Sequence, residues 1–478
     1  MLRLVAQFQT ALQRGERAGI VANARALVEA RANLARQWWP LAMIAAHNGE
    51  ARLARAAFDL FVASAPDHPA AHFRKVDLLA QLGAWREALA MLRAWPARWA
   101  RPATYAHARG TAAFYLGEAA EARAWLEEAV ARQPLAGTPW LTMNLLVDYA
   151  REPALAERAL AAQATMASAP PVLRGTFDYT LGKVHADRGE PARAFAAYAR
   201  GAALLKREFA YSREADRASA DEAVSGWDAV SIAELSAQQH EHTGRCIFVL
   251  GLPRSGTPLV EQILTSHSAV TDGGEIYRLP LLAKEAGGAS QAAVARYVRE
   301  TGPAAAARLW AHWLEERFPE PGRVVAKTPT NSRFLGVAAA LLPQAPLVWV
   351  TRDPLDCTWS CFRTRFAGEA PWSYDLEDIA FHFRREDELL ARWRAVLGER
   401  LLVVPYEALV AEPETWTRRL LAHCGLPDEP GPYAPHENAR PVTTTSAMQV
   451  RQPIRRMGLG AAEPYREFLA PFVAAYAG

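Results

Sequence analysis

The sequence has little of what would mark a secreted, zinc-binding or membrane-spanning protein. Its 478 residues include only four cysteines, and no CxxC pair is present, so neither a disulfide framework nor a zinc site is predicted. The longest apolar stretch, 337–350, is interrupted by two prolines and a glutamine and is too short to cross a bilayer. The N-terminal segment lacks the uninterrupted apolar core of a signal peptide. We therefore expect a cytoplasmic protein without a membrane span.

The chain also lacks an excess of charge of either sign. It has 54 basic and 51 acidic residues, a net charge of +3, which gives no support for a partner that is a nucleic acid or a membrane surface. The length exceeds what one compact core holds, so two or three domains are expected.

The first 210 residues contain a repeat and no stretch typical of a strand. Apolar residues recur at helical spacing, and Gly49, Gly83 and Gly117 are 34 residues apart, each followed five positions later by alanine. Gly189 continues the pattern after room for one degenerate unit. Glycine lets the chain turn between two helices, and alanine lets the helices pack closely. Residues 1–210 are predicted to form a solenoid resembling tetratricopeptide repeats, with a concave interaction surface, and residues 211–244 a helical linker. An alanine-rich helical bundle is the alternative.

From residue 245 the pattern changes to short apolar runs rich in β-branched residues. They cover 246–250, 324–326, 347–350 and 401–404, and helical patterns such as 291–316 and 376–397 separate them. Strands that alternate with helices predict a parallel sheet covered on both faces, here over residues 245–478. Ligands of such sheets bind at the carboxyl ends of the strands.

The loop after the first predicted strand, GLPRSGTP (251–258), has the glycine spacing of a P-loop without its usual chemistry. Thr257 and Pro258 stand where a nucleotide-hydrolysing P-loop has lysine and a magnesium-binding hydroxyl. The loop still offers backbone amides at a helix start, the cation of Arg254 and the hydroxyls of Ser255 and Thr257. This set suits a doubly charged phosphate whose chemistry needs no metal.

The wider segment FVLGLPRSGTPLVEQIL resembles the PRSGTTL loop of sulfotransferases that use 3′-phosphoadenosine 5′-phosphosulfate as donor. It is most similar to bacterial tetratricopeptide-sulfotransferases, whose catalytic domain is related to that of tyrosylprotein sulfotransferases, and the resemblance extends over essentially the whole chain. It implies that the 5′-phosphosulfate is held by Arg254, Ser255, Gly256 and Thr257. Pro258 departs from the family's second threonine and removes one hydroxyl and one N–H.

Two further loops match the family's catalytic residues. In HSAVTDGGE (267–275) two glycines precede Glu275, which the resemblance implies is the base that deprotonates the acceptor hydroxyl. His267 is interpreted as a residue that fixes this loop. Lys327 ends the second strand, in KTPTN, and the resemblance places its charge on the bridging oxygen of the leaving phosphate. Asn331 would orient that loop.

The remaining matches concern the nucleotide and the sulfate. The resemblance implies that Arg352 and Ser360 bind the 3′-phosphate and that Tyr406 contacts the adenosine. Ser446 matches a serine that positions the sulfate, and Arg451 is interpreted as closing over the donor. The predicted catalytic set is Glu275, Arg254, Lys327 and Ser446, with no metal.

These motifs predict a metal-independent sulfotransferase acting on a hydroxyl acceptor. A protein tyrosine, a glycan and a small metabolite would all fit, and the repeats would bind a peptide or protein acceptor. One alternative is an interaction scaffold with a degenerate nucleotide-binding domain, which Pro258 favours. The other is a P-loop kinase or NTPase, which the Thr257–Pro258 pair disfavours.

Overall fold

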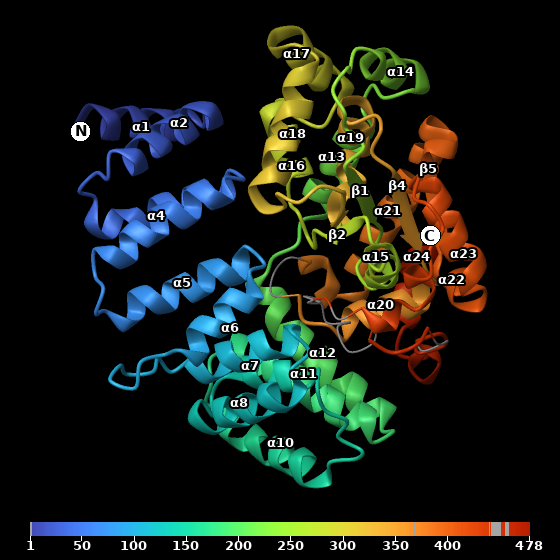
Figure 1. Ribbon diagram of the computed structural model, residues 1–478. Helices are drawn as coiled ribbons and strands as arrows, with labels where there is room; N and C mark the ends of the chain where they lie inside the picture. Colours follow the sequence, from blue (N-terminus) through green and yellow to red (C-terminus); the bar gives the residue numbers. More distant parts are fainter. Residues whose placement is uncertain (1, 367–369, 439, 441–450, 455–457) are drawn as a thin grey trace.

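The computed structural model describes residues 2–366, 370–438, 440, 451–454 and 458–478. The first half is all helical and runs down one side of the molecule before turning beneath the sheet (Figure 1). Its helices are α1 (Leu2–Arg14), α2 (Arg17–Glu29), α3 (Trp38–His47), α4 (Ala51–Ala63), α5 (Pro69–Gln81), α6 (Trp85–Arg93), α7 (Tyr105–Tyr115), α8 (Ala119–Arg132), α9 (Gly137–Met143), α10 (Pro153–Met166), α11 (Pro171–Asp187) and α12 (Pro191–Glu208). The helical region is confirmed, and its assignment to the tetratricopeptide class stays a prediction.

Each repeat glycine lies in the turn between two antiparallel helices. Gly49 joins α3 to α4, Gly83 joins α5 to α6, and Gly117 joins α7 to α8, with φ of 90°, 73° and 81°. Residues with a Cβ rarely adopt this left-handed conformation. The alanines five positions later are fully buried at the helix crossings: Ala54, Ala88, Ala122 and Ala194.

The second half contains a five-stranded, all-parallel sheet in the order β2-β3-β1-β4-β5. The strands are β1 (Cys246–Leu250), β2 (Val270–Asp272), β3 (Arg323–Lys327), β4 (Leu347–Thr351) and β5 (Leu401–Pro405). Successive β1 residues enter two different cores. Phe248 packs with α18 (Ala304–Arg317) and α19 (Leu335–Leu341) on one face, and Val249 packs with α15 (Thr257–Thr265) and α23 (Pro413–His423) on the other. Burial on both faces explains why the strand is continuously apolar.

Helices cover both faces of this sheet (Figure 1). They are α13 (Arg213–Val224), α14 (Ala229–Ala237), α15 (Thr257–Thr265), α16 (Leu279–Glu285), α17 (Gln291–Thr301), α18 (Ala304–Arg317), α19 (Leu335–Leu341), α20 (Pro354–Phe362), α21 (Leu376–Leu397), α22 (Tyr406–Ala411), α23 (Pro413–His423) and α24 (Ala470–Ala477). The single helix predicted over 291–316 is wrong, because Gly302, at φ 86°, separates α17 from α18. Helices α13 and α14 of the predicted linker pack into the sheet's core. The boundaries at 210 and 244 stay predictions.

The turns of the helical region pack against the second half. A Cβ on Gly49 would lie 2.4 Å from Trp313 Nε1 in α18, and one on Gly83 would lie 3.1 Å from Arg317. Glu50 is 1% exposed, and its carboxylate pairs with His312 of α18 at 2.9 Å. A second contact is apolar, since α11 and α12 share a hydrophobic core with α20 and α24. The two halves therefore pack against each other through both polar and apolar contacts.

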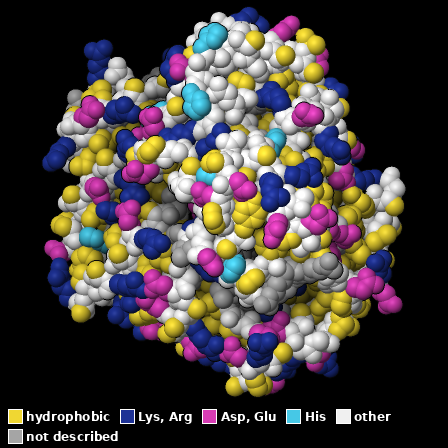
Figure 2. All heavy atoms as spheres, turned by 45° about the vertical axis from the view of Figure 1, so that its right-hand side comes forward, with side chains coloured by type: hydrophobic (Ala, Val, Ile, Leu, Met, Phe, Trp, Pro, Cys, Tyr) yellow, Lys and Arg dark blue, Asp and Glu magenta, His cyan; other side chains and the backbone are white. Residues whose placement is uncertain are grey.

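The surface agrees with the near-neutral composition. On the face shown in Figure 2, basic and acidic side chains are interspersed with apolar ones, and neither sign gathers into an extended patch. No helix in the described ranges combines the length and apolar character needed to cross a bilayer.

Candidate active site

The loop between β1 and α15 is forced into its shape by two glycines. Gly251 has φ 136°, and a Cβ there would lie 2.3 Å from the backbone oxygen of Val350 in β4. Gly256 has φ 107°, and its Cβ would lie 2.3 Å from Cδ2 of the Tyr406 ring. Helix α15 starts at Thr257 with proline in its first turn, a position where proline is tolerated. The loop thus keeps its amides at the helix start although the family's second threonine is replaced.

Three residues predicted to bind the donor meet at this loop from separate elements. Nε of Arg254 donates a hydrogen bond to Oγ of Ser360 in α20 at 2.9 Å. Nη1 of Arg352, which follows β4, donates to the backbone oxygen of Arg254 at 2.9 Å. Arg254 has φ 71°, a strained conformation for a residue with a Cβ, and such strain concentrates at functional sites. Their convergence creates a cationic site at the carboxyl ends of β1 and β4.

The loop's electrostatics favour a multiply charged anion. Burial, together with the charges of Arg363 and Arg352, lowers the pKa of Arg254 to about 10, because these cations repel one another. An anion would relieve that repulsion. Oγ of Ser255 is buried and has no hydrogen-bond partner within the described part of the chain. The loop therefore offers an anion both the positive charge of Arg254 and the hydroxyl of Ser255 as a hydrogen-bond donor.

The predicted adenosine contact lies beside the same loop. The Arg352 guanidinium carbon is 5.0 Å from the centre of the Tyr406 ring, a cation–π distance. Arg352 also donates to the backbone oxygen of Gly458. Because Tyr406 touches Gly256 as well, one ring connects the loop with the arginine predicted to bind the 3′-phosphate.

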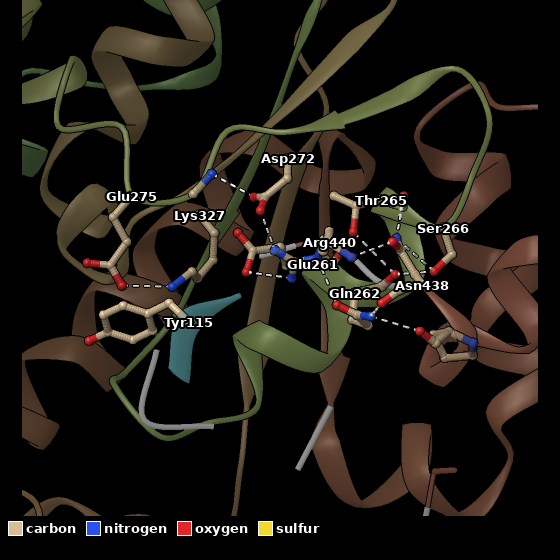
Figure 3. A network of polar contacts seen from close by, with 12 residues as sticks. Tyr115, Glu261, Gln262, Thr265, Ser266, Asp272, Glu275, Lys327, Asn438 and Arg440 are labelled. Atoms are coloured by element: carbon tan, nitrogen blue, oxygen red, sulfur yellow. Dashed lines mark hydrogen bonds and ion pairs between the residues drawn. The ribbon is translucent and has the colours of Figure 1, made fainter. Parts of the chain in front are cut away.

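Glu275 and Lys327 form an ion pair next to the sheet edge (Figure 3). Nζ of Lys327 donates to Oε1 of Glu275 at 2.7 Å, and Oη of Tyr277 donates to Oε2 at 2.7 Å. Burial alone would raise the pKa of Glu275, but the adjacent ammonium outweighs it and the pKa is lowered. Burial likewise opposes the charge of Lys327, which is 2% exposed, yet Glu261 and Glu275 raise its pKa. Both groups are charged at neutral pH.

A buried network that the sequence analysis missed supports this pair (Figure 3). Arg440 donates to Glu261 Oε2 at 3.1 Å, to Gln262 Oε1 at 2.7 Å and to Asp272. Glu261 is 1% exposed, and burial raises its pKa. The one available signal was the polar pair Glu261–Gln262 inside the otherwise apolar helix LVEQIL.

The other predicted residues are placed as follows. His267 is 2% exposed, accepts from the Ala269 amide at 3.0 Å and donates to the Pro427 oxygen at 3.0 Å. Nη2 of Arg451 donates to the backbone oxygens of Tyr115 at 3.1 Å and Arg440 at 3.3 Å, so it bridges α7 to the network. Asn331 is 1% exposed. Ser446 lies outside the described residues.

Within the described residues, one cluster has metal-ligand chemistry. Glu50, His312 and Glu316 lie at the contact between α18 and the helical region. Glu50 already pairs with Arg17 and His312, each at 2.9 Å. The charge of Glu50 is therefore balanced by Arg17.

Comparison with a family model concerns the second half of the chain. Its residues 246–430 match the model of the sulfotransferase family. This segment is sulfotransferase-like. The match includes every predicted site residue except Ser446 and Arg451.

Three relatives align with the chain. A protein of Aquifex aeolicus described as uncharacterized is 28% identical over 317 residues, which is 64% of this chain and 41% of that protein. Protein-tyrosine sulfotransferase 1 of Danio rerio is 28% identical over 196 residues, 38% of this chain and 53% of that protein. Protein-tyrosine sulfotransferase of Drosophila melanogaster is 23% identical, covering 38% of each chain. The chain thus spans less than two thirds of the length of these relatives.

Solved sulfotransferase structures also align at low similarity. The sulfotransferase domain of the Synechococcus PCC 7002 olefin synthase is 18% identical, covering 48% of this chain and 97% of that domain, with a TM-score of 0.34. Sulfotransferase STF9 of Mycobacterium avium is 16% identical, covering 66% and 96%, with a TM-score of 0.27.

Proposed function

We propose that this protein transfers a sulfuryl group from 3′-phosphoadenosine 5′-phosphosulfate to a hydroxyl acceptor. The observation that carries the proposal is the ion pair between the partly exposed Glu275 and the buried Lys327, together with a phosphate loop that lacks the P-loop lysine and the magnesium-binding hydroxyl. A general base and a buried cation at an anion site are what sulfuryl transfer needs. The family match of residues 246–430 supports it.

The arginines around the loop suit a donor with two phosphate-type groups. The 5′-phosphosulfate would bind at Arg254, Ser255 and the amides that start α15. The 3′-phosphate would bind at Arg352 and Ser360, the latter already hydrogen-bonded to Arg254. Tyr406 would contact the adenosine. Arginine binds phosphate through two parallel N–H groups, which supplies geometry as well as charge.

In the proposed reaction Glu275 takes the proton of the acceptor hydroxyl. The acceptor oxygen then forms a bond to sulfur while the bond from sulfur to the 5′-phosphate oxygen breaks, and Lys327 offsets the charge that develops on that oxygen. Ser446 is proposed to position the sulfate, and Arg451 to close over the donor. No metal is part of this scheme.

The ion pair with Lys327 makes the base strength of Glu275 depend on whether the donor is bound. Without donor, the ammonium of Lys327 lowers the pKa of Glu275 and makes it a weak base. An anionic donor would compete for that ammonium. The pKa of Glu275 would then rise, and its base strength with it, when the reaction partner is in place.

A tyrosine of a polypeptide is one proposed acceptor, since two relatives are named protein-tyrosine sulfotransferases. The helical region would hold such a polypeptide.

Calorimetry with adenosine 3′,5′-bisphosphate, in buffer containing a chelator, tests the donor site. We expect the bisphosphate to bind without metal. We expect no ATP binding even when magnesium is added. Magnesium-dependent ATP binding with no binding of the bisphosphate would instead support a kinase or NTPase. Bisphosphate binding without sulfate transfer to any acceptor in a lysate would support a scaffold.

A further inference from the structure

A cavity of about 620 Å³ opens at the carboxyl ends of β1 and β3, where the loops of the candidate active site begin. Residues 251–253 line it and end next to Arg254. Residues 329–330 line it two positions after Lys327, and Pro280 lines it five positions after Glu275. This edge is where ligands of parallel sheets bind, and the volume is that of a small-molecule site.

One wall of the cavity is a network of buried ionised groups. Arg333 pairs with Asp216 of α13 at 2.6 Å and with Glu386 of α21 at 2.9 Å. Arg333 is the one lysine or arginine among the described lining residues, and each of its terminal nitrogens is within ion-pair distance of a carboxylate. Two carboxylates face this single cation. The cavity therefore disfavours an anionic ligand, because no positive charge of the described lining is left to balance one.

The same wall presents an unused hydrogen-bond acceptor. Nδ1 of His382 donates to Oδ2 of Asp216 at 2.7 Å, and in the neutral imidazole this arrangement leaves the lone pair on Nε2. Nε2 has no hydrogen-bond partner within the described ranges, and the ring lines the cavity. Trp372 stacks on the imidazole, with ring centres 4.4 Å apart and planes 12° apart, which holds its orientation.

The rest of the lining is mainly apolar. Rings of proline, tryptophan and phenylalanine form it: Pro253, Pro280, Pro329, Phe334, Pro371 and Trp372. Such surfaces pack against an aromatic ring or the apolar face of a small molecule.

From this arrangement we propose that the cavity binds the body of the acceptor, and that the acceptor is a neutral, partly apolar molecule. One hydroxyl or phenol group of this molecule donates to Nε2 of His382, and a different hydroxyl is the one that Glu275 deprotonates. The proposal rests on the sulfotransferase function and narrows its substrate class. The Asp216–His382 pair acts in recognition, while Glu275 remains the proposed base.

The test compares two probes at pH 7: 4-fluorophenol, which is neutral, and 4-fluorophenylacetate, which is anionic. Binding of each probe is measured by ¹⁹F NMR with the full chain saturated with adenosine 3′,5′-bisphosphate. Ala215→Trp fills the cavity from the exposed face of α13. Ala218→Trp is the matched control, since it is exposed on the same helix and does not line the cavity. His382→Asn keeps an N–H for Asp216 and removes Nε2.

We expect 4-fluorophenol to bind the wild type and Ala218→Trp alike, and at least tenfold more weakly to Ala215→Trp. His382→Asn should weaken it about three- to tenfold, the effect of one lost hydrogen bond. The proposal is overturned if 4-fluorophenol does not bind the wild type, if Ala215→Trp binds it as well as Ala218→Trp does, or if the anion binds more tightly. Calorimetry with the bisphosphate separates the two proposals: its binding to all four proteins supports the donor site whatever the NMR outcome, and its failure counts against the function itself.

Discussion

Gly256→Ala places one methyl group between the phosphate loop and Tyr406. An alanine at φ 107° is strained by roughly 1–2 kcal/mol, which lowers stability. Its Cβ would also lie 2.3 Å from the Tyr406 ring, about 1 Å closer than an ordinary contact, so the ring or the loop must move. The Arg352 guanidinium lies over that ring, so the displacement reaches both proposed phosphate sites.

The expected weakening of donor binding in Gly256→Ala can be expressed as a change in Kd. Misplacing the groups that make one charge-assisted hydrogen bond costs about 1.5–3 kcal/mol, or roughly a 10- to 150-fold rise in Kd. We expect a rise of this size for adenosine 3′,5′-bisphosphate, measured by calorimetry. Gly302→Ala is the control, because Gly302 has φ 86° and nothing within 4 Å of an added Cβ. It should lower stability and leave Kd unchanged. A Kd for Gly256→Ala within twofold of the wild type would refute the placement of the donor at this loop.

Three further predictions follow from single contacts. Gly49→Ala should lower the free energy of unfolding by about 1–3 kcal/mol more than Gly189→Ala, because Gly49 faces Trp313 and an added Cβ on Gly189 meets nothing within 4 Å. Urea unfolding measures both losses, and equal losses would refute the contact between the helical region and α18. Lys327→Met should destabilise the protein most near neutral pH, and the loss should shrink as pH falls below about 4. The pKa of Glu275 is lowered in the folded protein, so its ion pair with Lys327 stabilises the fold above the ordinary pKa of a glutamate and is lost in acid. Urea unfolding of both proteins at several pH values tests this, and a loss that grows in acid would contradict it. Arg352→Lys keeps the charge but loses the two parallel N–H groups of the guanidinium, so it should raise the Kd for adenosine 3′,5′-bisphosphate about tenfold. The Kd for adenosine 5′-phosphosulfate, which has no 3′-phosphate, should stay within twofold of the wild type. Equal losses of affinity for both ligands would argue against a 3′-phosphate site at Arg352.

Short, continuously apolar runs made most of the sheet predictable. β1, β3, β4 and β5 coincide with the predicted apolar runs, and in β1, β3 and β4 nearly every residue is buried. β2 (Val270–Asp272) was missed because it has three residues and one buried side chain, too few for a pattern. The break at Gly302 was hidden within helical spacing on both sides.

The candidate site was predictable where residues follow strand ends. Arg254, Arg352 and Lys327 each end or follow a strand, and neighbouring parallel strands bring such residues together. The support around them was not predictable. Arg440 meets Asp272 and Glu261 across 168 and 179 residues of sequence, and only the packed fold shows that a lone arginine near a glycine–proline segment enters the core.

Transfer itself tests the central claim most directly. The measurement is the rate at which adenosine 3′,5′-bisphosphate forms from 3′-phosphoadenosine 5′-phosphosulfate, with a panel of phenols and tyrosine peptides, for the wild type and Glu275→Gln. We expect acceptor-dependent formation by the wild type and at least a hundredfold slower formation by Glu275→Gln, with bisphosphate affinity retained, as for loss of a general base. No acceptor-dependent formation by the wild type, or equal rates for the two proteins, would contradict the account.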